Sequence, residues 1–60
     1  MHKIYYDKER NFTIVDVSGV KSIEQIKEEF GDCDYQNLEI DPHKEQFEVV
    51  DGVLLKKTLV

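Results

Sequence analysis

The residues of this chain that are able to do chemistry are concentrated between positions 31 and 43. Cysteine occurs once, at Cys33, with an aspartate on each side of it. A thiolate acts as a nucleophile, and it also binds metal ions together with imidazole and carboxylate groups. The candidate ligands for such a metal are Asp32, Cys33, Asp34, Asp41 and His43. The stretch therefore raises two hypotheses, a reactive cysteine and a metal site.

The surroundings of Cys33 in the sequence argue against both hypotheses. Cys33 follows a predicted helix C-terminus, where the helix dipole is negative, and the neighbours Asp32 and Asp34 add two negative charges. These groups disfavour the thiolate form, which is the reactive one. The candidate ligands lack the CxxC or HxxxH spacing of zinc sites and the spacing of a calcium loop. We therefore expect Cys33 to be a small residue in a turn, and we expect no metal or other cofactor.

Other catalytic patterns are also missing from the sequence. There is no glycine-rich phosphate loop, and the two histidines are His2 near the N-terminus and His43 in a polar loop. A chain of 60 residues is expected to have difficulty forming a pocket of ~300 Å³, the lower end for ligand sites. We predict that the protein is not an enzyme. A metal-dependent or thiol-dependent enzyme centred on Cys33 is kept only as a third hypothesis.

The composition predicts one small folded domain spanning residues 1–60. Hydrophobic residues are 40% and charged residues 35% of the chain, which is too apolar for a disordered segment. The formal net charge of −5 disfavours direct binding to nucleic acid or to an anionic membrane. No signal peptide and no run of about 18 apolar residues is present, and the single cysteine excludes an intramolecular disulfide. We therefore expect a cytoplasmic protein.

The first half of the chain predicts a hairpin followed by a helix. The β-rich runs 3–7 and 12–17 are joined by four polar residues, which is typical of a hairpin. Ser22 and Gln25 form a capping box at the start of a helix over 22–30. Ile23, Ile26 and Phe30 lie on one face of this helix. Gly31 is expected to end it with a positive φ.

The second half predicts three further strands. Leu38 and Ile40 alternate with polar residues, and Pro42 ends this strand. Strands at 47–50 and 53–60 flank Asp51-Gly52, which is a strong hairpin signal. The predicted fold is α+β in the order ββαβββ. It consists of an antiparallel sheet of four to five strands with one helix packed on one face.

Three surface features predict partner binding. At least one of the adjacent residues Tyr5 and Tyr6 is expected to face away from the core. The acids of the helix and of the following strand are expected to form a negative patch, to which Glu39 and Asp41 also contribute. The predicted docking residues are Tyr5, Tyr6, Glu24, Glu28, Glu29, Asp32, Asp34 and Tyr35. The last strand is apolar on both faces, so it is either central or pairs with another copy.

Two functional hypotheses follow from these surfaces. The first is a small acidic protein-binding module, an accessory or inhibitory protein that occludes a surface of a basic or nucleic-acid-binding partner. A chain of this size and acidity fits a phage or mobile-element product. The alternative is a self-associating structural unit, a homodimer formed through the C-terminal strand.

Overall fold

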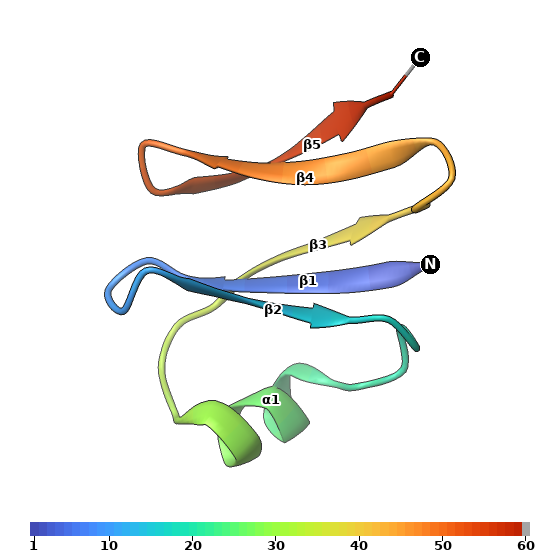
Figure 1. The fold of residues 1–60 in the computed structure, drawn as a ribbon. Coiled ribbons are helices and arrows are strands. Elements are labelled where there is room, and N and C mark those ends of the chain that lie inside the picture. Colours follow the sequence, from blue (N-terminus) through green and yellow to red (C-terminus); the bar gives the residue numbers. More distant parts are fainter. Residues whose placement is uncertain (60) are drawn as a thin grey trace.

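The computed structural model describes residues 1–59 and consists of one helix and five strands in this range (Figure 1). The elements are β1 (His2–Asp7), β2 (Phe12–Asp16), α1 (Ile23–Phe30), β3 (Gln36–Ile40), β4 (Glu45–Val50) and β5 (Val53–Thr58). The predicted ββαβββ order and the small α+β class are confirmed. The predicted last strand extended to Val60, which lies outside the described residues.

β1 is the central strand of a three-stranded antiparallel sheet with the order β2-β1-β3. Ile4 of β1 pairs with Val15 of β2 on one side and with Leu38 of β3 on the other. The chain turns from β1 into β2 through Asn11, whose φ is 52°. Asparagine tolerates this left-handed conformation better than most residues do. The predicted N-terminal hairpin is therefore confirmed.

β4 and β5 form a second hairpin around Asp51 and Gly52. Both residues have positive φ, at 51° and 75°, as a type I′ turn requires. Val50 and Val53 pair directly across this turn. The Asp51-Gly52 signal thus correctly predicted the position of the turn.

The five strands form two sheets, so the predicted single sheet of four to five strands is wrong. Within residues 1–59, β4 and β5 pair only with each other. The Gln36 side chain joins the sheets instead: its Nε2 donates to Gly52 O at 2.7 Å and its Oε1 accepts from Leu54 N at 2.8 Å. A side-chain amide offers the same donor and acceptor as a peptide unit. Alternating hydrophobicity does not distinguish this side-chain bridge from a continuous backbone ladder.

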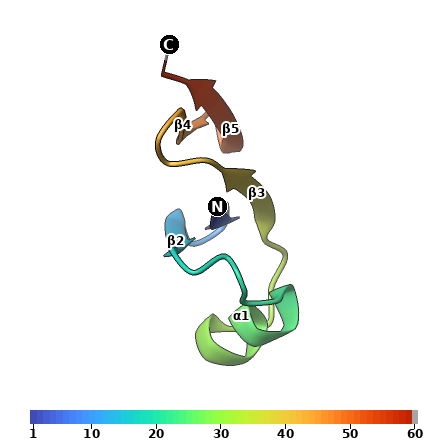
Figure 2. The ribbon, with the colours of Figure 1, turned by 90° about the vertical axis from the view of Figure 1, so that its right-hand side faces the viewer.

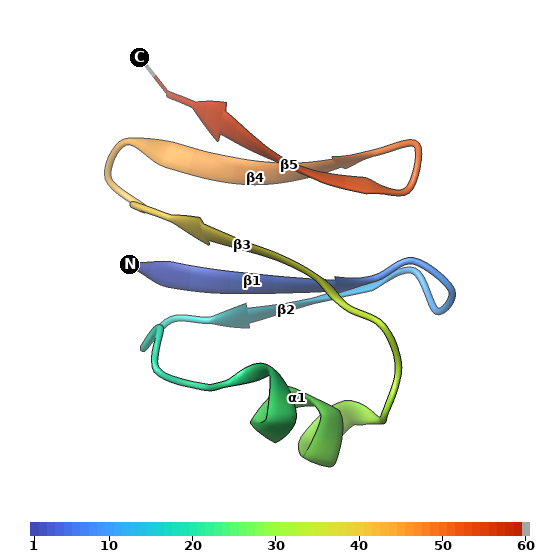
Figure 3. The same cartoon turned by 180° about the vertical axis from the view of Figure 1, so that it is seen from behind.

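α1 lies beyond β2 at one end of the molecule, and the β4–β5 hairpin lies next to β3 at the other end (Figure 1). Figures 2 and 3 show the helix and the hairpin at opposite ends from two other directions. The core between the sheets consists of Ile4, Tyr6, Ile40 and Leu54, with Leu38, Phe47 and Val49 packed against it. The Cα extents of 35 × 27 × 11 Å make the molecule thin. Few side chains can therefore be wholly buried.

α1 begins as predicted and packs through one main side chain. Gln25 N donates to Ser22 Oγ at 3.3 Å and Ser22 N donates to Gln25 Oε1 at 2.9 Å, which confirms the capping box. Ile26 is wholly buried. Phe30 keeps 40% of its surface exposed and lies 6.4 Å from the Phe12 ring, centroid to centroid. The helix is thus held on the sheet at Ile26 and less firmly at its C-terminal end.

Candidate functional site

Arg10, in the turn between β1 and β2, connects three segments that are distant in the sequence. Its guanidinium donates to Phe30 O at 2.8 Å and to Tyr35 Oη at 2.8 Å. It also donates to Cys33 Sγ at 3.1 Å and forms an ion pair with Asp7. Because Phe30 O is an orphan carbonyl of the last helical turn, Arg10 serves as a C-terminal cap. We call Asp7, Arg10, Cys33 and Tyr35 the Arg10 cluster.

The ion pair within the Arg10 cluster fixes the charge of both partners. The hydrogen bond from Arg10, more than any other contact, holds the pKa of Asp7 below its usual value. The same bond raises the pKa of Arg10. Glu9 N also donates to Asp7 Oδ1 at 3.0 Å, so this carboxylate organises the turn as well. The cluster was not predicted, because the sequence shows Arg10 only as one residue of a polar turn.

Cys33 lies beside a cation, which the sequence did not reveal. Its Sγ accepts a hydrogen bond from Arg10 at 3.1 Å and donates one to Asp7 Oδ2 at 3.3 Å. The expectation that only negative groups surround this thiol is therefore wrong. Sγ thus lies between a guanidinium and a carboxylate that form an ion pair with each other. Cys33 therefore links the segment after α1 to the β1–β2 turn through its contacts with Arg10 and Asp7.

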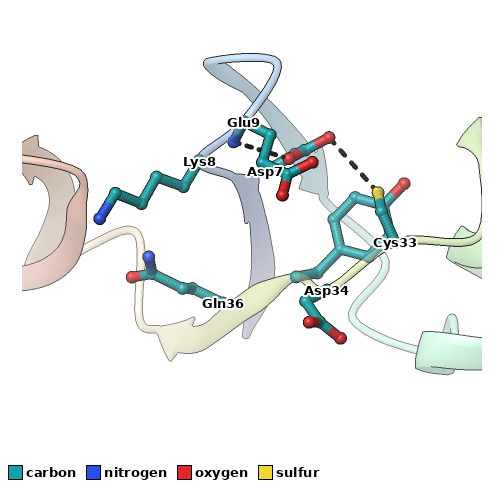
Figure 4. Close-up of a pocket in the computed structure, with 7 residues that line it drawn as sticks. Asp7, Lys8, Glu9, Cys33, Asp34 and Gln36 are labelled. Carbon is teal, nitrogen blue, oxygen red and sulfur yellow. Dashed lines mark hydrogen bonds between the residues drawn. The ribbon is translucent and has the colours of Figure 1, made fainter.

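The Arg10 cluster borders a cavity of about 330 Å³ (Figure 4). The cavity is lined by Asp7, Lys8, Glu9, Cys33, Asp34, Tyr35 and Gln36. Figure 4 shows the Cys33 thiol directed at the Asp7 carboxylate on one side of the cavity. We expected so short a chain to have difficulty forming a pocket of ~300 Å³, whereas the structure has one of about this size. The cavity forms because the β1–β2 turn and the segment before β3 both project beyond the sheet.

The structure separates the candidate metal ligands into two groups. Residues 32–34 precede β3, whereas Asp41 and His43 follow it. Asp41 has a role in the β3–β4 turn, where its Oδ1 accepts from His43 N at 3.0 Å and its carbonyl accepts from Lys44 N at 3.0 Å. No three His, Cys, Asp or Glu side chains within residues 1–59 are grouped as metal ligands.

The adjacent tyrosines Tyr5 and Tyr6 are buried, with 4% and 3% of their surfaces exposed. The prediction that one of them faces away from the core is wrong, because β1 is covered on both faces. The Tyr5 hydroxyl donates to Lys21 O at 2.8 Å on the helix side, and the Tyr6 hydroxyl donates to Asn11 Oδ1 at 3.1 Å. Tyr35 is half-buried within the Arg10 cluster. Tyr6 and Tyr35 therefore do not belong to the docking surface proposed below, and Tyr5 contributes to it only as a buried wall of its hollow.

The acids of α1 differ in whether they are paired. Glu29 forms an ion pair with Lys21 at 2.8 Å. Glu24 and Glu28 are exposed, and neither forms an ion pair within residues 1–59. Since they are four positions apart, they lie on one face of the helix, away from Glu29. Glu24 and Glu28 thus place two carboxylates without an ion-pair partner side by side on the exposed side of α1.

The two other predicted docking acids lie beyond the end of α1. Asp32 is almost wholly exposed and is 3.9 Å from Lys27 Nζ, which partly balances its charge. Asp34 is exposed and lines the cavity next to the Arg10 cluster. The predicted acidic residues therefore do not form one continuous patch. They form one group on α1 and another beside the cavity.

A hollow of about 210 Å³ lies between the start of α1 and β3. It is lined by Lys3, Tyr5, Ile23, Asn37, Leu38 and Glu39. Burial, followed by the charges of Asp16, Glu39 and Glu24, raises the pKa of Tyr5. Glu39 lines the hollow on β3, and Glu24 follows Ile23, which lines it on α1. We use the name α1–β3 face for this hollow, with Glu39 in its lining, together with the exposed carboxylates of Glu24 and Glu28 on the outer side of the adjacent helix α1.

Comparison with known proteins finds no matching family model, curated protein or solved structure. Within residues 1–59, the structure contains no helix long and apolar enough to cross a membrane. The function therefore has to be inferred from the surfaces of the molecule itself.

The buried aspartates predict a loss of stability in acid. The pKa of Asp7 is lowered by Arg10, and the pKa of Asp16 is lowered chiefly by the Ser18 hydroxyl. The unfolded chain, with aspartate pKa values near ~3.9, therefore binds protons at a higher pH than the folded chain does. Stability is fully present above that value and is lost as the pH falls through the lower folded pKa values.

Thermal unfolding followed by circular dichroism between pH 6 and pH 2 measures this loss. The midpoint is expected to fall steeply below about pH 4. Asp16→Asn should flatten the curve over this range, whereas Asp51→Asn, at an exposed turn, should keep the wild-type pH dependence. If the pH dependence of Asp16→Asn equals that of the wild type, Asp16 is not a source of the loss of stability in acid.

Proposed function

We propose that this protein is a small protein-binding module whose α1–β3 face docks on a positively charged segment of a partner protein. It acts as an accessory or inhibitory protein that occludes this segment. The observation that supports the proposal is the unpaired state of Glu24 and Glu28, while Glu29 on the same helix is neutralised by Lys21. Unpaired surface carboxylates of one sign steer a cationic partner towards this side of the molecule.

The hollow in the α1–β3 face suits a long basic side chain. Ile23 and the Tyr5 ring offer apolar surface for the aliphatic stem of an arginine or lysine, and Glu39 offers a carboxylate for its charged end. Lys3 pairs with Glu39 in the β1–β3 register and lines the same hollow. Glu39 is therefore partly compensated, so that Glu24 and Glu28 make the larger contribution to attraction.

Titration of the isotope-labelled protein with a synthetic arginine-rich decapeptide tests the proposal by NMR. Amide shifts are expected to change in residues 23–28 and 37–39, and the affinity is expected to fall as salt is added. The double variant Glu24→Lys/Glu28→Lys should bind at least tenfold more weakly, because attraction at this face becomes repulsion.

The matched control is Glu9→Lys/Asp34→Lys, which changes the net charge equally but alters the acids beside the other cavity. This control should keep the affinity within about threefold, since rim charges away from a docking site contribute little. Equal losses in the two double variants, or shifts confined to β4 and β5, would exclude the α1–β3 face as the docking surface. In a lysate, a partner captured by the wild type and not by Glu24→Lys/Glu28→Lys is the one that uses this face.

A further inference from the structure

The outer face of the β4–β5 hairpin is apolar near its turn. Leu54 points into the core, so the alternating neighbours point outward. Val50, Val53 and Leu55 keep 45%, 47% and 41% of their surfaces exposed. A two-stranded hairpin is only marginally stable by itself. This hairpin packs on the core through one face, while its other face has no covering layer within residues 1–59.

The hairpin is also the neutral part of an acidic chain. In residues 44–59 the basic and acidic side chains balance: Lys44, Lys56 and Lys57 against Glu45, Glu48 and Asp51. Residues 1–43 therefore carry the entire formal net charge of −5. Two copies that approach each other through residues 1–43 repel one another, whereas two hairpins do not.

We propose that a second copy of this chain packs on the outer face of the hairpin and forms a two-fold symmetric dimer. In this dimer β4 of each copy lies over β5 of the other. Val50 then meets Val53 of the second copy, and Glu48 lies beside Lys57 of the second copy. Both residues of each contact belong to the same face, so the face is self-complementary and the assembly closes as a dimer. The apolar side chains are buried and the two charges are paired.

The dimer has a consequence for the function proposed above. α1 lies at the opposite end of the molecule from the hairpin (Figure 1), so the two α1–β3 faces of a dimer remain uncovered. A partner with two basic segments then binds through both faces and gains affinity from the linkage. Only this consequence depends on the proposed function, because the dimer itself is tested without any partner.

Sedimentation equilibrium from micromolar to millimolar concentration tests the dimer. The mass is expected to rise from the 7.1 kDa of one chain to twice this value. Leu55→Lys places a charge in the apolar contact and should weaken dimerisation at least tenfold. Val20→Lys is the matched control, because Val20 is 78% exposed in the loop before α1, and it should dimerise as the wild type does.

Charge reversal tests the arrangement within the dimer. Glu48→Lys and Lys57→Glu should each weaken dimerisation, and the double variant should restore it because opposite charges meet again. A wild-type chain that stays monomeric at every concentration overturns the proposal, as does a Leu55→Lys chain that dimerises normally. If Leu55→Lys fails to fold, concentration-dependent amide shifts of the wild type decide: shifts in residues 46–57 support the dimer, and shifts confined elsewhere overturn it.

Discussion

Replacement of Ile26 by alanine is expected to lower the free energy of unfolding by about 2–5 kcal/mol. Ile26 has 0% of its surface exposed and is the buried side chain of α1. A domain of this size rarely has more than about 3–5 kcal/mol of stability from its core. An eight-residue helix does not persist in water without such an anchor. Loss of the Ile26 side chain therefore frees α1 and removes the α1–β3 face with it.

Urea unfolding followed at 222 nm measures this change. Val20→Ala is the matched control, since Val20 is 78% exposed and its truncation should alter stability by less than about 0.5 kcal/mol. In an Ile26→Ala protein that still folds, the arginine-rich peptide should bind more weakly, although no acidic residue has been changed. A loss of stability below about 1 kcal/mol would show that α1 is held by other contacts.

Features that depend on neighbours in the sequence were predictable. The capping box of Ser22 and Gln25 and the Asp51-Gly52 turn each involve residues at most three positions apart, and both form as expected. In both motifs all the interacting groups lie within one short segment, so the local sequence is sufficient to predict the structure. The element order followed from these local signals.

Features that depend on the packing of layers were not predictable. The exposure expected for one of Tyr5 and Tyr6 assumed that the sheet is covered on one side only. Because β1 is covered on both faces here, both adjacent tyrosines are buried, and tyrosine fits both sides because its hydroxyl finds a partner at the edge. Tyr5 and Tyr6 do point to opposite faces of β1, as expected for adjacent strand residues. This alternation does not indicate whether one face or both faces of the strand are covered.

In the candidate site, too, the exposure of single residues was predictable, but their ion-pair partners were not. The carboxylates of Glu24 and Glu28 are exposed as the helical pattern predicts. Lys21 pairs with Glu29, and Lys27 partly balances the charge of Asp32, but the sequence pattern alone does not assign these partners. Long side chains reach many positions, so their ion pairs are set by the final packing.

Replacement of Gln36 by leucine is expected to destabilise the protein by about 2–4 kcal/mol, because it leaves two backbone groups without partners. Gln36 is half-buried, and Leu54, whose N–H it binds, is 9% exposed. The second group is Gly52 O, which accepts from the same side chain at 2.7 Å. Hydrogen exchange at the Leu54 amide should accelerate, since the hairpin then opens more easily from the three-stranded sheet.

Gln36→Glu separates the loss of the donor from the loss of the acceptor. The introduced carboxylate still accepts from Leu54 N but faces the carbonyl of Gly52 without a proton to donate. Gln36→Glu is therefore expected to lower the free energy of unfolding less than Gln36→Leu does at pH 7. Its loss of stability relative to wild type should become smaller as the pH falls below about 4.3. A protonated carboxyl regains the donor that the amide supplied. If both variants lose the same free energy of unfolding at every pH, the hairpin is held by apolar contacts, and the hydrogen bonds of the Gln36 amide do not contribute.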